Sequence, residues 1–218
     1  MCNLYHESGI NYSNSCEAVH WHKNQDRPAQ FHANNIMISS CLDTLEADIR
    51  TRGLSIKYVA RGRELYHLSK RDFNLTQGKY LLVNNNAPVL ETRINTANTW
   101  GMCVDIEPGL VKDVLQQIVT PDLIDPVADL PKYFLTDELF VQENIAGPQL
   151  AGILEAMIKK ISSHSGPEEP RELLFDLTAQ IIRESMPTIG FYYRLKASRL
   201  STRKELYRRI LLGREVLE

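Results

Sequence analysis

The chain has 218 residues, 43% of them hydrophobic, which is enough to bury one substantial core. Its 25 Lys and Arg nearly balance 27 Asp and Glu, and a formal net charge of -2 argues against a general polyanion-binding protein. No run approaches the roughly 20 apolar residues that span a membrane, and the N-terminus lacks the pattern of a signal peptide. We therefore expect a cytoplasmic protein with no membrane partner.

Short strands dominate the first half of the sequence. Two candidates lie around residues 18–22 and 35–39, and six more follow from residue 54: LSIKYVARG, RELYHLS, FNLT, KYLLVNN, PVLETRI and TWGMCVDI. Turn residues such as Gly62 and Gly78 separate them. Because no helix intervenes, the spacing predicts antiparallel pairing in a sandwich, jelly roll or barrel.

The hydrophobic period changes to that of helices after Glu107. LVKDVLQQIV predicts one helix, PQLAGILEAMIKKISSH a second, and PRELLFDLTAQIIRES a third that Pro187 is expected to close. Strands followed by helices predict an α+β fold. The second helix has an apolar stripe, which could pack on the β unit or join two copies of the chain: Leu150, Ile153, Leu154, Met157 and Ile161.

The last eighteen residues, STRKELYRRILLGREVLE, predict one more helix. Thr202 and Glu205 fit a capping box, in which each side chain bonds an orphan backbone N–H. The helix then carries an apolar stripe and a cationic remainder, with Leu206, Tyr207 and Ile210 on the former and Arg208 and Arg209 on the latter. Such a helix alone has no turn and recognition helix with which to read bases.

No catalytic motif of recognised spacing occurs in the sequence, whether nucleophile elbow, phosphate loop, dinucleotide fingerprint or metalloprotease helix. The four cysteines form no C-x-x-C pair. His20 and His22 alternate on one predicted strand face and could ligate a metal together, if a third ligand converged on them. Histidines on a surface or in a turn are the alternative interpretation.

Aromatic side chains on the predicted strands are candidates for a ligand pocket, because an apolar wall with a few polar groups is typical of small-molecule sites. The alternative is that they pack in the core. The candidates are Tyr58, Tyr66, His67, Tyr80 and Trp100. Alternation along a strand requires neighbours Tyr66 and His67 to face opposite ways.

The run SIKYVARGRELYHLSKRDFNLTQGKYLLVNNNAPV, with WGMCVDIEPGLVKDVL after it, resembles the sensor domain of AraC-family transcription regulators. STRKELYRRILLGREVLE is similar to the segment that joins that domain to a helix-turn-helix unit. The resemblance implies a cupin-like barrel over residues 1–107, a helical dimerisation subdomain over 108–190, and a connector over 191–218. The two positions where metal-dependent cupins carry histidines hold other residues here, around Lys57 and at Val89.

The resemblance thus implies a non-catalytic regulatory domain without a cofactor. We expect a homodimer that responds to a small-molecule effector and reaches DNA only through a domain absent from this chain. Leu150, Ile153, Leu154, Met157 and Ile161 are the candidate dimer contacts. Two alternatives stay open: a metal-dependent cupin enzyme that uses His20 and His22, and an interaction module that binds no small ligand.

Overall fold

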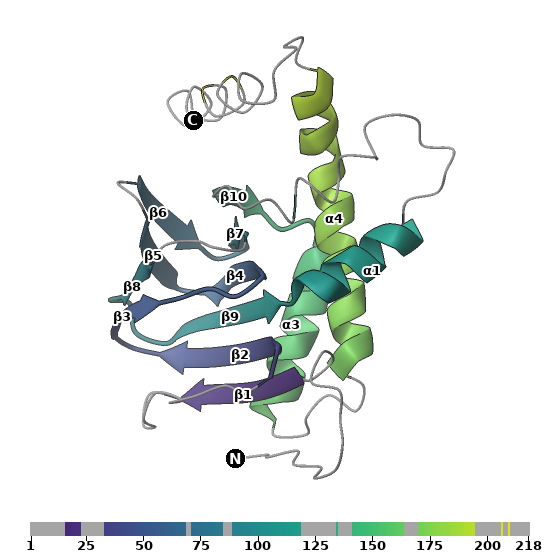
Figure 1. Ribbon diagram of the computed structural model, residues 1–218. Helices are drawn as coiled ribbons and strands as arrows, with labels where there is room; N and C mark the ends of the chain where they lie inside the picture. The colour runs from purple at the N-terminus through teal and green to yellow at the C-terminus, as the bar shows by residue number, and fades with distance from the viewer. Residues whose placement is uncertain are drawn as a thin grey trace.

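We analysed a computed structural model of the chain. It describes residues 16–22, 33–68, 71–84, 89–118, 134, 141–163, 170–194, 206 and 209. The strands are β1 (Cys16–His22), β2 (Asn35–Leu42), β3 (Leu45–Ile49), β4 (Leu54–Arg61), β5 (Arg63–Leu68), β6 (Arg71–Thr76), β7 (Lys79–Val83), β8 (Leu90–Ile94), β9 (Thr99–Ile106) and β10 (Val141–Ile145). The helices are α1 (Pro108–Ile118), α3 (Pro148–Ser162) and α4 (Pro170–Arg194) (Figure 1).

The strands form two sheets. One has six strands in the order β1-β2-β9-β4-β7-β10, and the other has four in the order β3-β8-β5-β6. The tight turns that join them use left-handed backbone, with Gly62 at φ 87° between β4 and β5 and Gly78 at φ 81° between β6 and β7. The predicted antiparallel pairing is correct throughout both sheets except at one edge, where β1 runs parallel to β2. A parallel neighbour needs a connecting segment long enough to cross over, and residues 23–34 supply one here.

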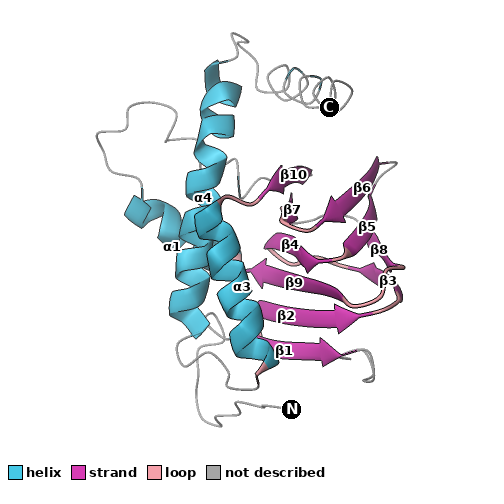
Figure 2. Ribbon diagram, turned by 180° about the vertical axis from the view of Figure 1, so that it is seen from behind, coloured by secondary structure: helices cyan, strands magenta, loops and turns pink. Residues whose placement is uncertain are grey.

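The three helices gather on one side of the six-stranded sheet, so the predicted α+β class is confirmed (Figures 1 and 2). Sequence patterns located all three helices, but they missed β3 and β10. The expected end of the third helix at Pro187 is wrong, because α4 continues to Arg194. Pro187 and Arg183, whose carbonyl the proline ring deprives of its partner, are both exposed, so water can satisfy that group.

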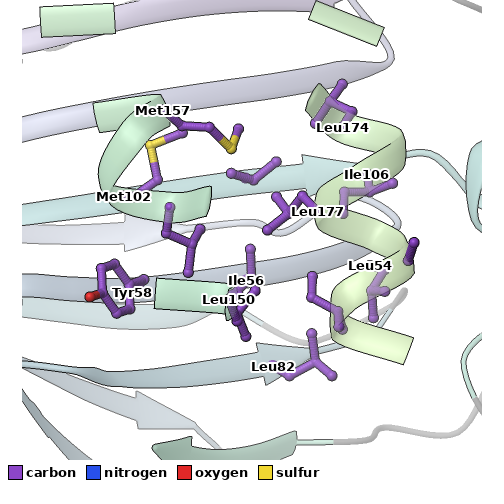
Figure 3. Close-up of a cluster of buried hydrophobic side chains, with 14 of the residues drawn as sticks. Leu54, Ile56, Tyr58, Leu82, Met102, Ile106, Leu150, Met157, Leu174 and Leu177 are labelled. Atoms are coloured by element: carbon purple, nitrogen blue, oxygen red, sulfur yellow. The ribbon is translucent and has the colours of Figure 1, made fainter. Parts of the chain in front are cut away.

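A large apolar core lies between the six-stranded sheet and the helices (Figure 3). Alternate residues of β4 face it, because successive side chains of a strand point to opposite faces. Leu54, Ile56 and Tyr58 belong there to the same buried cluster as Leu150 and Met157 of α3. Each such side chain, fully buried, contributes about 1.5 to 3 kcal/mol.

The apolar stripe of α3 belongs to this core. Leu150 and Leu154 are 0% exposed, and Met157 and Ile161 are also buried, while Ile153 is partly buried against the same cluster. The structure therefore assigns the stripe to packing within one chain, the first of the two roles that its pattern allowed. The four buried residues are therefore covered within one chain, and a dimer contact through the partly exposed Ile153 stays a prediction.

A second, smaller core fills the space between the two sheets. It contains Val59 and Leu81 from the six-stranded sheet and Tyr66, Phe73 and Leu75 from the four-stranded one. The two cores share β4 and β7, whose opposite faces each line one of them. Charged residues also enter this inter-sheet space, and they define the candidate site.

Candidate functional site

The inner face of the six-stranded sheet carries a row of polar side chains at its centre. Strands β4 and β9 pair so that Ser55 lies opposite Asp105 and Lys57 lies opposite Cys103. Directly opposed residues of an antiparallel pair share a face, so all four side chains enter the inter-sheet space. Ser55 donates a hydrogen bond to Asp105 Oδ1 at 2.5 Å, and Lys57 Nζ lies 3.4 Å from the same oxygen.

Lys57 is the most deeply buried cation of the part described, with its side chain 1% exposed against 8% for Asp105. Burial alone would lower the pKa of Lys57, but the charge of Asp105 and the neighbouring Cys103 raise it above its ordinary value. Lys57 therefore carries an ammonium ion at neutral pH. Removing an ion from water costs several kcal/mol even after relaxation. The attraction between the two charges of a buried ion pair offsets little more than that cost, so stability alone does not account for the pair. We therefore take it as a candidate functional site.

Cys103 of β9 is the direct neighbour of Lys57 across the two strands. Its Sγ lies 2.5 Å from Lys57 Nζ, and burial raises the pKa of the thiol to about 11 although Lys57 opposes that shift. The group is therefore a thiol, and not a thiolate, at neutral pH. Cys103 is only partly buried, as are Ile38 opposite it and Ser40 further along β2. Cys103 is consequently the part of this polar group that lies nearest to solvent, on the side of β2.

The second sheet contributes a carboxylate to the same space. Glu64 of β5 is 5% exposed, and Tyr66 donates a hydrogen bond to its Oε2. Gly101 leaves room for that carboxylate, since a Cβ there would overlap Glu64 Oε1 and approach Ser40 Oγ. Burial raises the pKa of Glu64 to about 7, against the opposing effects of Tyr66 and Lys57. Its protonation therefore changes near neutral pH.

We call this group the inter-sheet cluster; its members are Ser55, Lys57, Glu64, Tyr66, Cys103 and Asp105. It combines an ammonium, two carboxyl groups and hydroxyls beside an apolar wall, which includes Phe73 and Leu75. Such a set can donate hydrogen bonds to the polar end of a small molecule or accept hydrogen bonds from it, while the wall covers the apolar part of that molecule.

The aromatic candidates from the sequence do not converge on one pocket. Tyr66 belongs to the inter-sheet cluster, whereas Tyr58 and Tyr80 lie in the core under the helices. Tyr58 donates a hydrogen bond to Glu155 Oε1 of α3 at 3.3 Å, and burial raises its pKa to about 12. His67 faces outward, 2.6 Å from Asp72, and Trp100 packs near His20 with ring centroids 6.0 Å apart. Tyr66 and His67 thus face opposite ways, as alternation requires.

The two candidate metal ligands do share a strand face. The rings of His20 and His22 lie 6.4 Å apart, and His20 Nδ1 is 3.3 Å from Ser39 Oγ. Across the described ranges, no three or more His, Cys, Asp or Glu side chains gather in a way that could hold a metal ion. The structure thus brings no third ligand to this pair from those ranges.

The cluster residues other than Tyr66 were not among the sequence candidates, although the sequence holds a sign of them. Lys57 interrupts LSIKYVA and Asp105 interrupts GMCVDI, each as the one charge of an otherwise apolar or neutral run. An isolated charge on a strand that is buried on both faces has to find a partner inside the protein.

Two further features lie on the helical side. A surface hollow of about 450 Å³ lies beside α1 and α4, and its lining residues are Leu110, Asp113, Gln116, Gln117, Arg171, Glu172 and Phe175. Of the predicted connector, Leu206 and Arg209 are helical and exposed. Thr202, Glu205, Tyr207, Arg208 and Ile210 lie outside the described residues. No described helix is both long and apolar enough to cross a membrane.

The chain was compared with known protein families, curated sequences and solved structures. No protein-family model and no curated protein sequence matches the chain. Among solved structures, apo ToxT K231A from Vibrio cholerae strain SCE256 matches with a TM-score of 0.51 and 12% identity, over 86% of this chain and 76% of that one. The chain shares the fold of the matched part of ToxT.

Two other structures match less well. ToxT bound to an unsaturated fatty acid, from the same strain, has a TM-score of 0.38 and 12% identity, and the match covers 75% of this chain and 53% of that one. The AraC-like transcriptional activator CuxR has a TM-score of 0.40 and 9% identity, over 81% of this chain and 68% of that one.

Proposed function

We propose that this chain is the effector-binding regulatory domain of an AraC-type transcription regulator, non-catalytic, and that it controls a DNA-binding domain outside this chain. The observation that carries the proposal is the inter-sheet cluster, a set of buried ionisable groups inside a fold shared with ToxT. The AraC-like motifs of the sequence support the same role. A buried ion pair is weak evidence for a purely structural role, because well-packed apolar residues of similar volume are often at least as stabilising.

The effector would be a small molecule with an apolar body and a polar or anionic end. Its polar end would reach Lys57 past the partly exposed Ser40 and Cys103, and its body would lie on the wall that includes Phe73 and Leu75. For such a ligand to regulate, it must bind one conformation of the domain better than another. A ligand that competes with Asp105 for Lys57 would meet that condition.

Polar contacts link the strands to the helices and give the signal a route. Tyr58 of β4 bonds Glu155 of α3, and Gly147, just before α3, donates its backbone N–H to Glu184 Oε2 of α4 at 3.2 Å. α4 is the last long element before the proposed connector. In the proposal, a shift of β4 therefore moves α3 and α4, and two copies associate through helical residues outside the buried stripe of α3.

The test is ligand-dependent thermal stability, since a ligand that binds only the folded state at 100 times its Kd adds about 2.7 kcal/mol. The panel holds an unsaturated fatty acid, a saturated one, aromatic acids and sugars. We expect a ligand with an anionic end to raise the Tm of the wild type and to lose that effect in Lys57→Met.

Arg93→Met is the matched control. Arg93 of β8 also pairs with a carboxylate on a neighbouring strand, Glu46 at 3.2 Å, but its side chain is 62% exposed and lies on the face of β8 opposite to Thr92, which pairs with Tyr66 of the cluster. It should leave the ligand effect intact. No response to any compound would contradict the effector-binding role and favour the interaction module, and an equal loss in both variants would place the ligand elsewhere.

A further inference from the structure

The contact between Lys57 and Cys103 is closer than an ordinary hydrogen bond. Their Nζ and Sγ atoms lie 2.5 Å apart, whereas even the smaller oxygen acceptor normally stays about 2.7 to 3.2 Å from a nitrogen donor. Sulfur is larger, so an ammonium and a thiol that are not bonded belong further apart still. Two atoms at this separation are placed as if one more atom were bonded to both.

The positions of the two residues favour such a bond. They face each other across β4 and β9, so the backbone pairing holds their side chains on the same face without any rearrangement. Lys57 is 1% exposed and has little freedom to turn away. Cys103 is partly exposed beside Ile38 and Ser40, so a molecule about as small as water can reach its sulfur.

We propose that Lys57 and Cys103 form a reversible oxidative cross-link, in which one oxygen atom joins the lysine nitrogen to the cysteine sulfur. The oxidant is hydrogen peroxide. The inference concerns the chemistry of this pair and does not depend on the proposed role in transcription. It assigns a modification site to two residues that an effector would also meet.

The chemistry balances in two steps. In the first, the Cys103 thiol loses its proton as its sulfur takes an oxygen from peroxide. The O–O bond breaks, the hydroxide released takes up that proton, and the products are a sulfenic acid and water. In the second, the Lys57 amine, a second peroxide and the sulfenic acid give the N–O–S bridge and two waters. Each peroxide accepts two electrons, and the proton that the ammonium loses passes to Asp105 or to water. Four equivalents of a thiol reductant return the amine, the thiol, one water and two disulfides.

The cross-link would change the cluster as well as join two strands. The ammonium charge disappears, so Asp105 loses its cation at 3.4 Å and keeps the hydrogen bond from Ser55. Strands β4 and β9 lie at the centre of the six-stranded sheet. Oxidation would therefore fix the middle of this sheet and alter the electrostatics of the effector site together.

Peptide mapping of the folded protein tests the proposal. The protein is treated with hydrogen peroxide, denatured without reductant and digested with trypsin. Trypsin does not cut after a modified lysine, so we expect peptide 53–61 joined to peptide 94–112, with the summed mass plus one oxygen minus two hydrogens. Peptide 53–57 should be lost in proportion, and dithiothreitol should restore it.

Three controls separate the link from general oxidation. Cys103→Ser and Lys57→Arg should each abolish the linked species, and peroxide added to the unfolded wild type should not produce it. Cys16 is the internal control, because it is also partly buried but lies beside the acid Glu17, and it should join to no lysine. Met102 shares peptide 94–112, and its sulfoxide adds an oxygen without joining two peptides.

Two results would overturn the proposal. One is oxidation of Cys103 to a sulfinic acid while trypsin still cuts fully after Lys57. The other is a linked pair whose mass is two hydrogens below the sum, because it would mean a direct S–N bond instead of the oxygen bridge.

Discussion

The two faces of the six-stranded sheet are built from the same strands and yet differ in chemistry. Toward the helices, β4 and β9 present Leu54, Ile56 and Val104 to a continuous apolar core. Toward the other sheet, the same strands present Lys57 and Asp105 among other polar groups. Burial of apolar side chains on the first face stabilises the fold. Burial of charged groups on the second face costs solvation free energy. The comparison indicates that one face holds the domain together, and the other carries the groups that we propose to bind an effector.

The largest effect is expected from breaking the buried ion pair. Asp105→Asn leaves the Lys57 ammonium without its counter-charge, and we expect the free energy of unfolding to fall by about 3 to 5 kcal/mol. Urea denaturation measures it. Asp72→Asn is the control, because the Asp72 side chain is 88% exposed beside His67, and its effect should stay within about 0.5 kcal/mol.

A second variant sharpens this result. Lys57→Met combined with Asp105→Asn removes both charges and keeps a hydrogen-bonding partner for Ser55, so it should recover most of the lost stability. A double variant no more stable than Asp105→Asn alone would mean that charge burial is not the cause.

The apolar face should respond to lost volume. Leu154 of α3 is 0% exposed, and Leu154→Ala should lower the free energy of unfolding by about 2 to 5 kcal/mol through lost burial and the cavity left behind. Lys159→Ala on the exposed side of the same helix should change it by less than about 0.5 kcal/mol. Equal effects in urea denaturation would show that α3 does not pack as described.

The polar face should also make stability depend on pH. Glu64 has a pKa of about 7 in the folded protein, against its ordinary value of 4.5, so the folded state holds a proton that the unfolded chain releases between these values. Stability is therefore highest below pH 4.5 as far as Glu64 is concerned, and it falls as pH rises to 7, by about 3 kcal/mol in all at about 1.4 kcal/mol per pKa unit.

Glu64→Gln should remove that contribution, because the amide is neutral at every pH. Urea titrations of both proteins from pH 5 to 8 give the difference directly. A difference that does not change with pH would contradict the raised pKa of Glu64.

The smallest effect concerns a link between helices. Glu184 accepts the N–H of Gly147 at the start of α3, where a negative charge is favourable. Glu184→Ala should cost about 1 kcal/mol, the size typical of a lost N-terminal cap. Arg183→Ala, the exposed neighbour in α4, should cost less in the same thermal or urea measurement. If the two variants are equal, the carboxylate does not cap α3.

The elements with strong local patterns could be predicted from the sequence. Alternation and turn residues located β4 to β9, and helical periodicity located α1, α3 and α4. The polar strand β10, VQENI, has no such pattern, and its pairing with β7 is decided by the folded chain. The parallel arrangement of β1 is likewise a matter of tertiary structure.

The candidate site was harder to predict for a related reason. Lys57 and Cys103 are 46 residues apart, and only the register of β4 against β9 brings them together. Periodicity showed that Tyr66 and His67 point in opposite directions, but it could not show which of them faces inward. Tyr58 and Tyr80, chosen for a pocket, face the helices because β4 and β7 turn those positions toward α3 and α4.

Gly101 makes residues 64 and 101 depend on one another. The carboxylate of Glu64 occupies the volume that a side chain at position 101 would need, so a larger residue at one position requires a smaller one at the other. Gly101→Ala should therefore be much less harmful in a Glu64→Ala background than in the wild type. Among relatives of this chain, a glycine at this point of β9 would then identify those that keep a long acidic side chain between their sheets.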